Sequence, residues 1–544
     1  MSSPLAELRA AVAQAATALA GDSAVGAQAR LERPKREGQG DYATNLAMLL
    51  APVLRSSPRE IAERVGEALS QVLGDELERF EVAGPGFVNL FLSDGWHRRA
   101  LRTALDAGEG FGSGGAAEPA RVLVEFVSAN PTGPLVAASG RHAAYGDALS
   151  RILAHYGHDV WREYYFNDAG TQIQLLGESV QARARDEAVP ENGYQGEYVA
   201  ELAADIPDAA SRPVAEVSAE AVSVLLAQIK ATLERYGVHY DRFFSERTLH
   251  EGSPSYLDRA LQIVADGGHS YESEGALWLR TTTFGDDKDR VLRRSSGAPT
   301  YFAADLAYLL EKLERGLDLQ VLPFGADHHG YIARLKAAFE TLGGDPSAIE
   351  IPILQFVHLI EGDERAAMSK RRGEFISLDE LLDEIGVDAT RFFMLQRSHD
   401  RTVDLDLELA RRESPENPVY YVQYAHARIV SMIGKLDEDR VMAALGADAG
   451  WDGGPLQEAE RDLIKALVAF PDEVDEAAER RAPHRIANYA LELAQQFTAF
   501  YRDCKVVGAE PAATESFRVA LSQASRETIK LALFLLGVGA PDSM

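Results

Sequence analysis

The spacing of hydrophobic residues predicts helices at both ends of the chain and a sheet between them. Near the start, Leu5, Leu8 and Val12 recur at helical spacing. Phe80–Leu92 has the character of an extended segment folded around a Gly-Pro-Gly turn. The glycine-rich stretch 108–115 contains a G-x-G spacing, but it follows a helical pattern and opens no helix, so we interpret it as a linker.

A valine-rich run opens the middle of the chain. Arg121–Val127 is short and apolar, as expected of a buried parallel strand. The loop Ser128–Leu135 carries two prolines and a glycine, and a helical pattern then runs from about residue 140 to 156. A strand, a tight loop and a helix in this order are typical of the opening of a nucleotide-binding α/β unit.

The remaining pattern divides the chain into domains. Residues from about 170 to 270 are helical and polar, and the α/β pattern returns at Gln320–Phe324 and Ile349–Phe356, which predicts an insertion within one sheet domain. From Asn417, where Asn-Pro marks a helix start, the pattern stays helical. We expect an N-terminal α+β domain over residues 1–110, an α/β domain over 118–410 with an insertion around 180–290, and an all-α domain over 415–544.

The composition is that of a folded globular protein with an excess of acidic residues. Apolar residues make up 46% of the chain and charged residues 26%. The 55 Lys and Arg against 84 Asp and Glu give a net charge of −29. This charge disfavours a protein that holds nucleic acid or an anionic membrane through a diffuse positive field, but it allows a small local basic surface.

The single cysteine and the apolar runs indicate the compartment. Cys504 alone excludes an intramolecular disulfide and a multi-thiolate zinc site, so we expect a reducing compartment and no zinc. The first 21 residues lack the basic start and clean apolar core of a signal peptide, and no apolar run reaches the ~20 residues of a spanning helix. We expect a cytoplasmic protein with no membrane partner.

Two segments carry charged residues at positions suited to a ligand. Glu125–Leu135 joins the predicted strand to the next helix, where parallel sheets bind ligands, although its Glu and Asn also suit an exposed strand end and a turn. Met368–Gly373 places Lys370, Arg371 and Arg372 beside a glycine. Such a loop can hold polyphosphate or form a solvated face.

Three further motifs allow both a functional and an ordinary structural interpretation. Tyr301 and Asp305 share a helix face after the N-cap Thr300, which can bind a guanidinium or ammonium group or form a half-buried surface. Asp327–His329 could suggest a metal, but adjacent strand residues point to opposite faces, so we expect none. The helix after Asn417 carries aromatic and basic residues that suit the core or base stacking: Tyr420, Tyr421, Tyr424 and Arg428.

Taken together, these segments resemble a class I aminoacyl-tRNA synthetase, specifically the arginyl-tRNA synthetase family. The resemblance covers nearly the whole chain, and its long matches occur in the right order. The matching segments are DYATNLAM (41–48), AGPGFVNLFLS (83–93), EFVSANPTGPL (125–135), YYFNDAGTQI (164–173), PTYFAADLAY (299–308), GADHHGY (325–331), MSKRRG (368–373), residues 415–429 and LGVGAPDSM (536–544).

The resemblance implies a Rossmann-like catalytic domain, an N-terminal domain that contacts tRNA and a C-terminal helical domain that binds the anticodon. It implies activation of arginine by ATP with Mg²⁺, followed by transfer to the terminal adenosine of tRNA(Arg). Members of the family generally need tRNA even for the first step. We expect a monomer.

The family's functional positions carry over to residues of this chain. The resemblance implies Lys370, Ser139 and Arg371 as catalytic residues. For arginine it implies Glu125, Asn130, Tyr301, Asp305 and His328. For ATP it implies Pro131, Thr132, Gly133, Met368, Ser369 and Lys370. For tRNA it implies Tyr420, Tyr421, Tyr424, Arg428 and Met544.

The chain departs from the family at its first signature. The family normally has H-x-G-H after Pro134-Leu135, and this chain has Val-Ala-Ala-Ser over residues 136–139; Ala367 also replaces the usual first lysine of the second signature. Losing one such donor typically costs ~10²–10³ in rate.

Three explanations compete. An active enzyme could use the Ser139 hydroxyl, helix N-terminal amides or His142, although His142 also suits a surface helix position. Alternatively, the chain is a degenerate paralogue that binds tRNA or arginine without charging, or a nucleotidyltransferase with another acceptor. We favour the active enzyme, because the arginine positions, the basic loop and both end domains remain together.

The net charge limits how such a protein could bind tRNA. Contacts would have to be local, and we expect them at Lys370–Arg372, at the pairs Arg98-Arg99 and Arg480-Arg481, and along the aromatic helix after Asn417.

Overall fold

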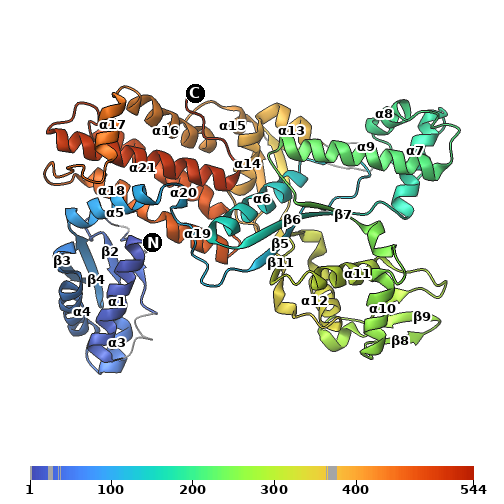
Figure 1. The fold of residues 1–544 in the computed structure, drawn as a ribbon, viewed down its shortest axis with the longest axis horizontal. Helices are drawn as coiled ribbons and strands as arrows, with labels where there is room; N and C mark the ends of the chain where they lie inside the picture. The colour runs from blue at the N-terminus through green and yellow to red at the C-terminus, as the bar shows by residue number, and fades with distance from the viewer. Residues whose placement is uncertain (1–2, 22–27, 35, 37, 363, 366–375) are drawn as a thin grey trace.

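The computed structural model describes residues 3–21, 28–34, 36, 38–362, 364–365 and 376–544. The N-terminal domain packs helices on an antiparallel sheet of strand order β1-β2-β4-β3 (Figure 1). The expected extended segment is the hairpin of β3 and β4, joined by a turn over residues 84–86. The elements of this domain are α1 (Pro4–Ala20), β1 (Leu31–Glu32), β2 (Tyr42–Thr44), α3 (Leu46–Leu54), α4 (Pro58–Leu73), β3 (Leu77–Ala83), β4 (Phe87–Leu92) and α5 (Asp94–Ala107).

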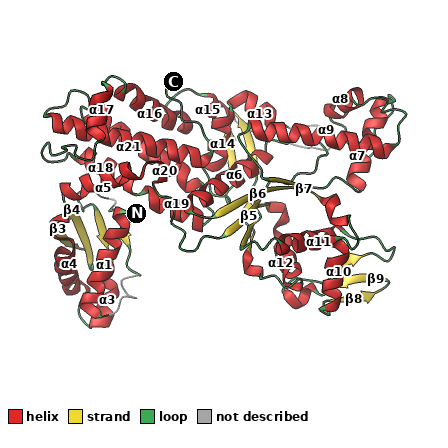
Figure 2. Cartoon of the chain, viewed as in Figure 1, coloured by secondary structure: helices red, strands yellow, loops and turns green. Residues whose placement is uncertain are grey.

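A parallel five-stranded sheet forms the centre of the molecule, as the α/β pattern predicts. Its strand order is β13-β11-β5-β6-β7, with every neighbouring pair parallel. This open, helix-covered sheet is Rossmann-like. Figure 2 shows these strands with helices around them, in a different part of the molecule from the N-terminal strands. The strands are β5 (Arg121–Glu125), β6 (Asp159–Phe166), β7 (Arg242–Ser245), β11 (Leu319–Val321) and β13 (Ile349–Glu350).

Helices cover both faces of this sheet. Helix α6 (Ser139–Tyr156) packs on one face, while α11 (Tyr301–Glu314) and α12 (Ile332–Thr341) cover the other (Figure 1). Gly146 of α6 allows the close approach, because a Cβ there would lie 2.1 Å from the ring of Phe126. The end of β5 and the middle of α6 are therefore held tightly together.

The expected insertion around 180–290 is not continuous, because β7 lies within it and joins the central sheet. A helical excursion precedes β7 and has its own core, formed by α7 (Thr171–Ala184), α8 (Glu197–Asp205) and α9 (Val214–Arg235). A second excursion follows β7 and contains α10 (Tyr256–Asp266), β8 (Ser270–Ser273), β9 (Ala276–Leu279) and β10 (Arg290–Arg293). A four-residue strand is too short to stand out by hydrophobic periodicity.

Short strands and helices connect the sheet to the C-terminal part. Strand β12 pairs with β14 in parallel, and β15 pairs with β16 and β17. These elements are β12 (Phe324–Gly325), β14 (Ile353–Leu354), β15 (Val357–Glu361), β16 (Glu364–Arg365), α13 (Leu378–Ile385), α14 (Val387–Leu395), β17 (Val403–Asp406) and α15 (Leu407–Arg411).

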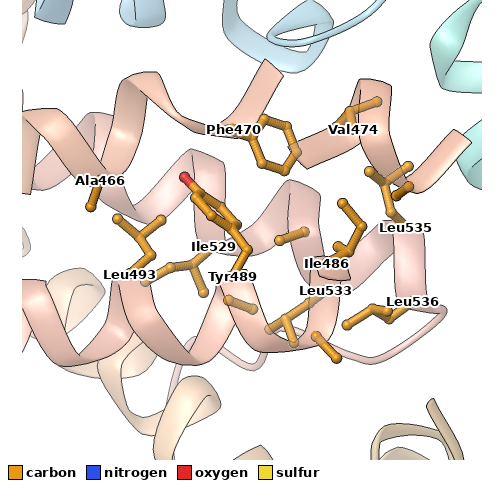
Figure 3. Packing of buried hydrophobic residues seen from close by; sticks show 14 of the residues in the cluster. Ala466, Phe470, Val474, Ile486, Tyr489, Leu493, Ile529, Leu533, Leu535 and Leu536 are labelled. Carbon is orange, nitrogen blue, oxygen red and sulfur yellow. The ribbon is translucent and has the colours of Figure 1, made fainter. Parts of the chain in front are cut away.

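The C-terminal domain is helical, as its pattern predicts. In Figure 3, Phe470 of α19, Tyr489 of α20 and Ile529 of α21 contribute to one buried hydrophobic cluster. The helices are α16 (Pro418–Ile433), α17 (Glu438–Leu445), α18 (Glu458–Val468), α19 (Phe470–Glu479), α20 (His484–Asp503) and α21 (Ala512–Leu536). None of the described helices is both long and apolar enough to cross a bilayer.

A buried ion pair connects the helices on the central sheet to the C-terminal helices. Arg391 of α14 bonds Asp147 of α6 at 2.5 Å, and both side chains are fully buried. The same guanidinium donates to the carbonyl of Tyr236, after α9, and to that of Leu536, at the end of α21, at 3.0 and 2.9 Å. One side chain thus joins four helices.

We expect Asp147→Asn to lower the stability of the protein strongly. The substitution leaves the guanidinium of Arg391 buried without a negative partner, a loss that typically costs about 3–5 kcal/mol. Scanning calorimetry should show a clear fall in melting temperature. Arg412→Ala, which breaks an exposed pair with Glu416, is the control and should change it little. Equal shifts in the two variants would contradict this role.

Candidate active site

A cavity of about 740 Å³ opens at the carboxyl ends of the parallel strands. Glu125 ends β5, Asn167 follows β6, Glu246 follows β7 and Leu354 ends β14, and all four line it. In an open parallel sheet, ligands bind at this edge. The structure brings together here Glu125, Asn130, Ser139, Tyr301, Asp305 and His328, which are six of the predicted site residues.

The wall of this cavity is acidic. The acidic and basic side chains among the described residues that line it are four carboxylates and two imidazoles: Glu125, Glu246, Asp305, Asp327, His142 and His328. No Lys or Arg of the described part of the chain is among them. Such a wall attracts a cation.

Asp305 of α11 is half-buried in the cavity wall. Burial, together with the charges of Glu246 and Glu125, raises the pKa of Asp305 to about 6. The hydroxyl of Tyr331 donates to the Asp305 carboxylate and opposes the rise. Tyr301, on the same helix face, is 61% exposed at the cavity. A half-buried carboxylate beside other carboxylates is poised to accept a cationic group.

Glu246 belongs to the site, although the sequence analysis does not identify it. It follows β7 directly, and the hydroxyl of Tyr165 donates to its carboxylate. Burial raises the pKa of Glu246. The available signal is a carboxylate placed just after the paired aromatics Phe243 and Phe244, which predicts the end of a buried strand.

A buried lysine, which the sequence pattern does not single out, forms an ion pair with Glu125. Lys312 of α11 is 2% exposed and bonds the Glu125 carboxylate. Its ammonium group lies 4.1 Å from the ring centroid of Tyr308, whose hydroxyl donates to Glu163 at 2.6 Å. Lys312 lies seven residues after Asp305, two helical turns along the same face, and this spacing was the available signal.

The loop after β5 adopts a strained backbone to build the cavity wall. Val127 and Ser128 have φ values of 67° and 41°, which non-glycine residues rarely adopt. The Ser128 hydroxyl donates to Glu125 at 3.2 Å and accepts the amide of Tyr165 at 3.1 Å. Asn130 accepts the amide of Asn167 at 3.2 Å. The loop is therefore fixed to the neighbouring strand β6.

The start of α6 has fewer free amides than the sequence suggests. The N–H groups of Ser139, Gly140 and Arg141 donate to the carbonyls of residues 136, 137 and 138 at 2.8, 3.0 and 3.2 Å. These three amides are therefore satisfied within the turn. Ser139 itself lines the cavity.

The surface interpretation of His142 is wrong. Its side chain lines the cavity one turn after Ser139. Burial and, to a smaller extent, the charge of Arg141 lower the pKa of His142 to about 4. The sequence position alone gave no sign of this, because the inner face of α6 is set by its packing on the sheet.

The residues expected at ATP divide into two groups. Pro131, Thr132 and Gly133 do not line the cavity, because they are buried under Tyr198 of α8, whose hydroxyl donates to the Thr132 carbonyl at 2.8 Å. The other predicted positions, Met368, Ser369, Lys370 and Arg371, lie outside the described residues.

A second, smaller cavity of about 330 Å³ lies at the end of the chain. Tyr424, Arg428 and Met544 line it, and the ring of Tyr420 stacks on that of Tyr424 at 6.0 Å. Arg428 donates to the Tyr424 hydroxyl at 2.6 Å. Tyr421 instead packs against the hydrophobic core, so it does not belong to this surface.

The two arginine pairs expected at tRNA are engaged within the fold. Arg98 donates to the carbonyls of Trp451 and Gly454 at 3.1 and 2.6 Å. Arg99 pairs with Glu76, Arg480 with Glu476 and Arg481 with Glu350, at 2.5, 2.6 and 2.7 Å. The side chains of Arg98 and Arg481 are mostly covered, whereas those of Arg99 and Arg480 are 44% and 67% exposed. The expectation that these pairs contact tRNA stays a prediction.

Three family models match successive parts of the chain. Residues 6–92 match the arginyl tRNA synthetase N-terminal domain, residues 215–413 the class I (R) tRNA synthetase catalytic domain, and residues 422–544 the DALR anticodon binding domain. These matches occur in the same order as the N-terminal, central and C-terminal parts described above.

Whole-length relatives agree with these models. The arginine–tRNA ligase of Shouchella clausii is 42% identical over 529 residues, and that of Frankia alni is 44% identical over 530 residues; each match covers 94% of both chains. The solved arginyl-tRNA synthetase of Thermus thermophilus superposes with a TM-score of 0.77 at 25% identity, over 99% of both chains.

We expect Lys312→Met to destabilise the protein by leaving the Glu125 carboxylate without its ion-pair partner in the cavity wall. The double variant Lys312→Met/Glu125→Gln removes both charges and should recover much of the lost stability. Thermal unfolding of wild type, both single variants and the double variant provides the measurement. Additive losses in the double variant would contradict a coupled pair.

Proposed function

The chain belongs to the arginyl-tRNA synthetase family and is an arginine–tRNA ligase, and from this premise we propose which residues carry its reaction. In the first step, the arginine carboxylate attacks the α-phosphate of ATP, the bond to the β-phosphate breaks, and pyrophosphate leaves. In the second step, a hydroxyl of the terminal adenosine of tRNA(Arg) attacks the carbonyl of the adenylate, and AMP leaves.

The acidic end of the larger cavity suits arginine. We propose that Asp305 and Glu246 bind the guanidinium group, because both half-buried carboxylates line the cavity and lie close enough for the charge of Glu246 to raise the pKa of Asp305. Glu125 and Tyr301 complete this side of the pocket. Asn130 would contact the backbone end of the amino acid. His328 would contact the substrate from the rim of the pocket.

We propose that ATP enters as its Mg²⁺ complex. Mg²⁺ is usually held by substrate phosphates with one or two carboxylates, so the metal would arrive with the nucleotide. Lys370 and Arg371 of the basic loop would neutralise the pyrophosphate side of the transition state, and Ser139 would donate a hydrogen bond to a phosphate oxygen. This assignment rests on the sequence of the loop and on the position of Ser139 in the cavity.

The smaller cavity suits an unstacked base. Stacked tyrosine rings and an arginine beside an open pocket are a common arrangement for single-stranded nucleic acid. We propose that Tyr420, Tyr424, Arg428 and Met544 contact the anticodon. We also propose that the protein works as a monomer in the cytoplasm, the reducing compartment that its single cysteine favours.

The acidic cavity at the strand ends is the observation that carries this assignment, and ATP–pyrophosphate exchange tests it. We expect exchange that requires both arginine and tRNA(Arg), with Asp305→Asn losing most of the arginine-dependent rate. Exchange at background with tRNA binding intact would indicate a binding protein. Exchange that ignores arginine but responds to another carboxylic acid would indicate a different nucleotidyltransferase.

We expect the KM for arginine to rise as the pH falls below about 6. The pKa of Asp305 is raised to about 6, so the carboxylate is ionised above this pH and protonated below it. A protonated Asp305 cannot pair with a guanidinium, and the KM should rise by up to about tenfold per pH unit. Exchange assays between pH 5 and 8 would measure the effect. An unchanged KM across this range would contradict the role of Asp305.

A further inference from the structure

The larger cavity presents a problem of charge. The ligand proposed for it includes a triphosphate, yet four carboxylates line its wall. Among the described residues that line it, only His142 and His328 can carry a positive charge. His328 is 62% exposed by side chain and lies 3.5 Å from Asp327, so its charge would be balanced by that carboxylate.

We propose that His142 is a catalytic residue of adenylate formation, whose imidazolium contacts the phosphate chain of ATP and takes up its proton as the triphosphate binds. This inference rests on the proposed function. It assigns to a residue outside the signature the phosphate contact that the family obtains from histidines at the positions of Val136 and Ser139.

The geometry of α6 favours His142 over the other donors. The amides of Ser139, Gly140 and Arg141 already donate to carbonyls of the preceding turn. The Ser139 hydroxyl remains available but carries no charge. His142 lies three residues further along the helix, on the same side, and both residues line the cavity.

A neighbouring arginine holds this turn in place. Arg141 is 2% exposed and donates to the carbonyls of Gln355, Ser398 and Arg401 at 2.6, 2.9 and 2.7 Å. Gln355 also lines the cavity. The His142 ring is therefore presented from a fixed turn, as a preorganised phosphate contact requires.

The groups that face His142 keep it neutral in the free protein. Burial, Arg141 and His328 lower its pKa, whereas Asp327 and a hydrogen bond to the backbone of Pro323 raise it, and the result is about 4. Pro323 offers only a carbonyl, so the ring nitrogen that bonds it carries the hydrogen. The second nitrogen gains a hydrogen only in the imidazolium.

A bound triphosphate supplies the missing counter-charge. One negative charge about 4 Å away, at an effective dielectric constant of about 20, is enough to bring ionisation of the ring back toward neutral pH. The nucleotide affinity should therefore depend on pH, and the affinity should weaken as the pH rises from 6 to 8.5.

Calorimetry tests the proton uptake directly. Mg²⁺-bound α,β-methylene ATP, which resists cleavage at the bond that the reaction breaks, is titrated at pH 7 in buffers of different ionisation enthalpy. We expect wild type to take up a substantial fraction of one proton and His142→Asn to take up almost none. His155→Asn is the matched control and should behave as wild type, because His155 lies at the other end of α6 and bonds the Phe111 carbonyl at 2.9 Å.

Exchange kinetics test the catalytic contact. We expect His142→Asn to lower the kcat of exchange by ~10²–10³ with little change in the KM for arginine. A wild-type rate in this variant would overturn the inference. Nucleotide binding by the wild-type protein without proton uptake would also overturn it, and this measurement needs no variant, so it decides even if His142→Asn folds poorly. Absence of exchange and of nucleotide binding in wild type would instead overturn the proposed function, and this inference with it.

Discussion

Two buried charges on one helix determine how the parts of this protein are placed. Arg141 and Asp147 of α6 are 2% and 0% exposed, and a buried charge is tolerated only where partners surround it. Arg141 donates hydrogen bonds to the carbonyls of Gln355 and Ser398, and Asp147 forms an ion pair with Arg391. Because Arg391 also bonds the ends of α9 and α21, the sheet, the helical excursion and the C-terminal helices all meet at α6.

This arrangement explains how an acidic protein can activate a cationic amino acid with an anionic nucleotide. Glu125 and Glu246 come from strand ends and Asp305 comes from α11, and all three line the cavity. The ammonium group of Lys312 neutralises the charge of Glu125. In the proposed reaction, the start of α6 supplies the phosphate contacts, which are the hydroxyl of Ser139 and the imidazole of His142. The pKa of Arg141 is lowered to about 10 by burial, so this residue stays charged at neutral pH and keeps its carbonyl partners.

The sequence predicts those features that depend on local pattern. The strand at Arg121–Glu125, the helix after it, the N-terminal hairpin and the C-terminal helices all follow from periodicity and turn residues. The pairing of Tyr301 with Asp305 in one site follows from helical spacing.

Features that depend on tertiary packing could not be predicted in this way. Strand β7 is too short to show a period, and Lys312 acts through a contact with a distant strand. Tyr421 packs against the core although Tyr420 and Tyr424 do not. The same limit applies to Arg98 and Arg481, whose guanidinium groups bond partners remote in sequence, the Trp451 carbonyl and the Glu350 carboxylate. His142 is not a surface histidine, because the packing of α6 places its side chain at the cavity.

The central claim is that α6 supplies the phosphate contact that the altered signature lacks. A crystal structure with Mg²⁺-bound α,β-methylene ATP, arginine and tRNA tests it most directly. The account predicts a ring nitrogen of His142 within about 3 Å of a phosphate oxygen, with the hydroxyl of Ser139 beside it. Phosphates bound elsewhere in the cavity, with the His142 ring contacting only the Pro323 carbonyl, would contradict it.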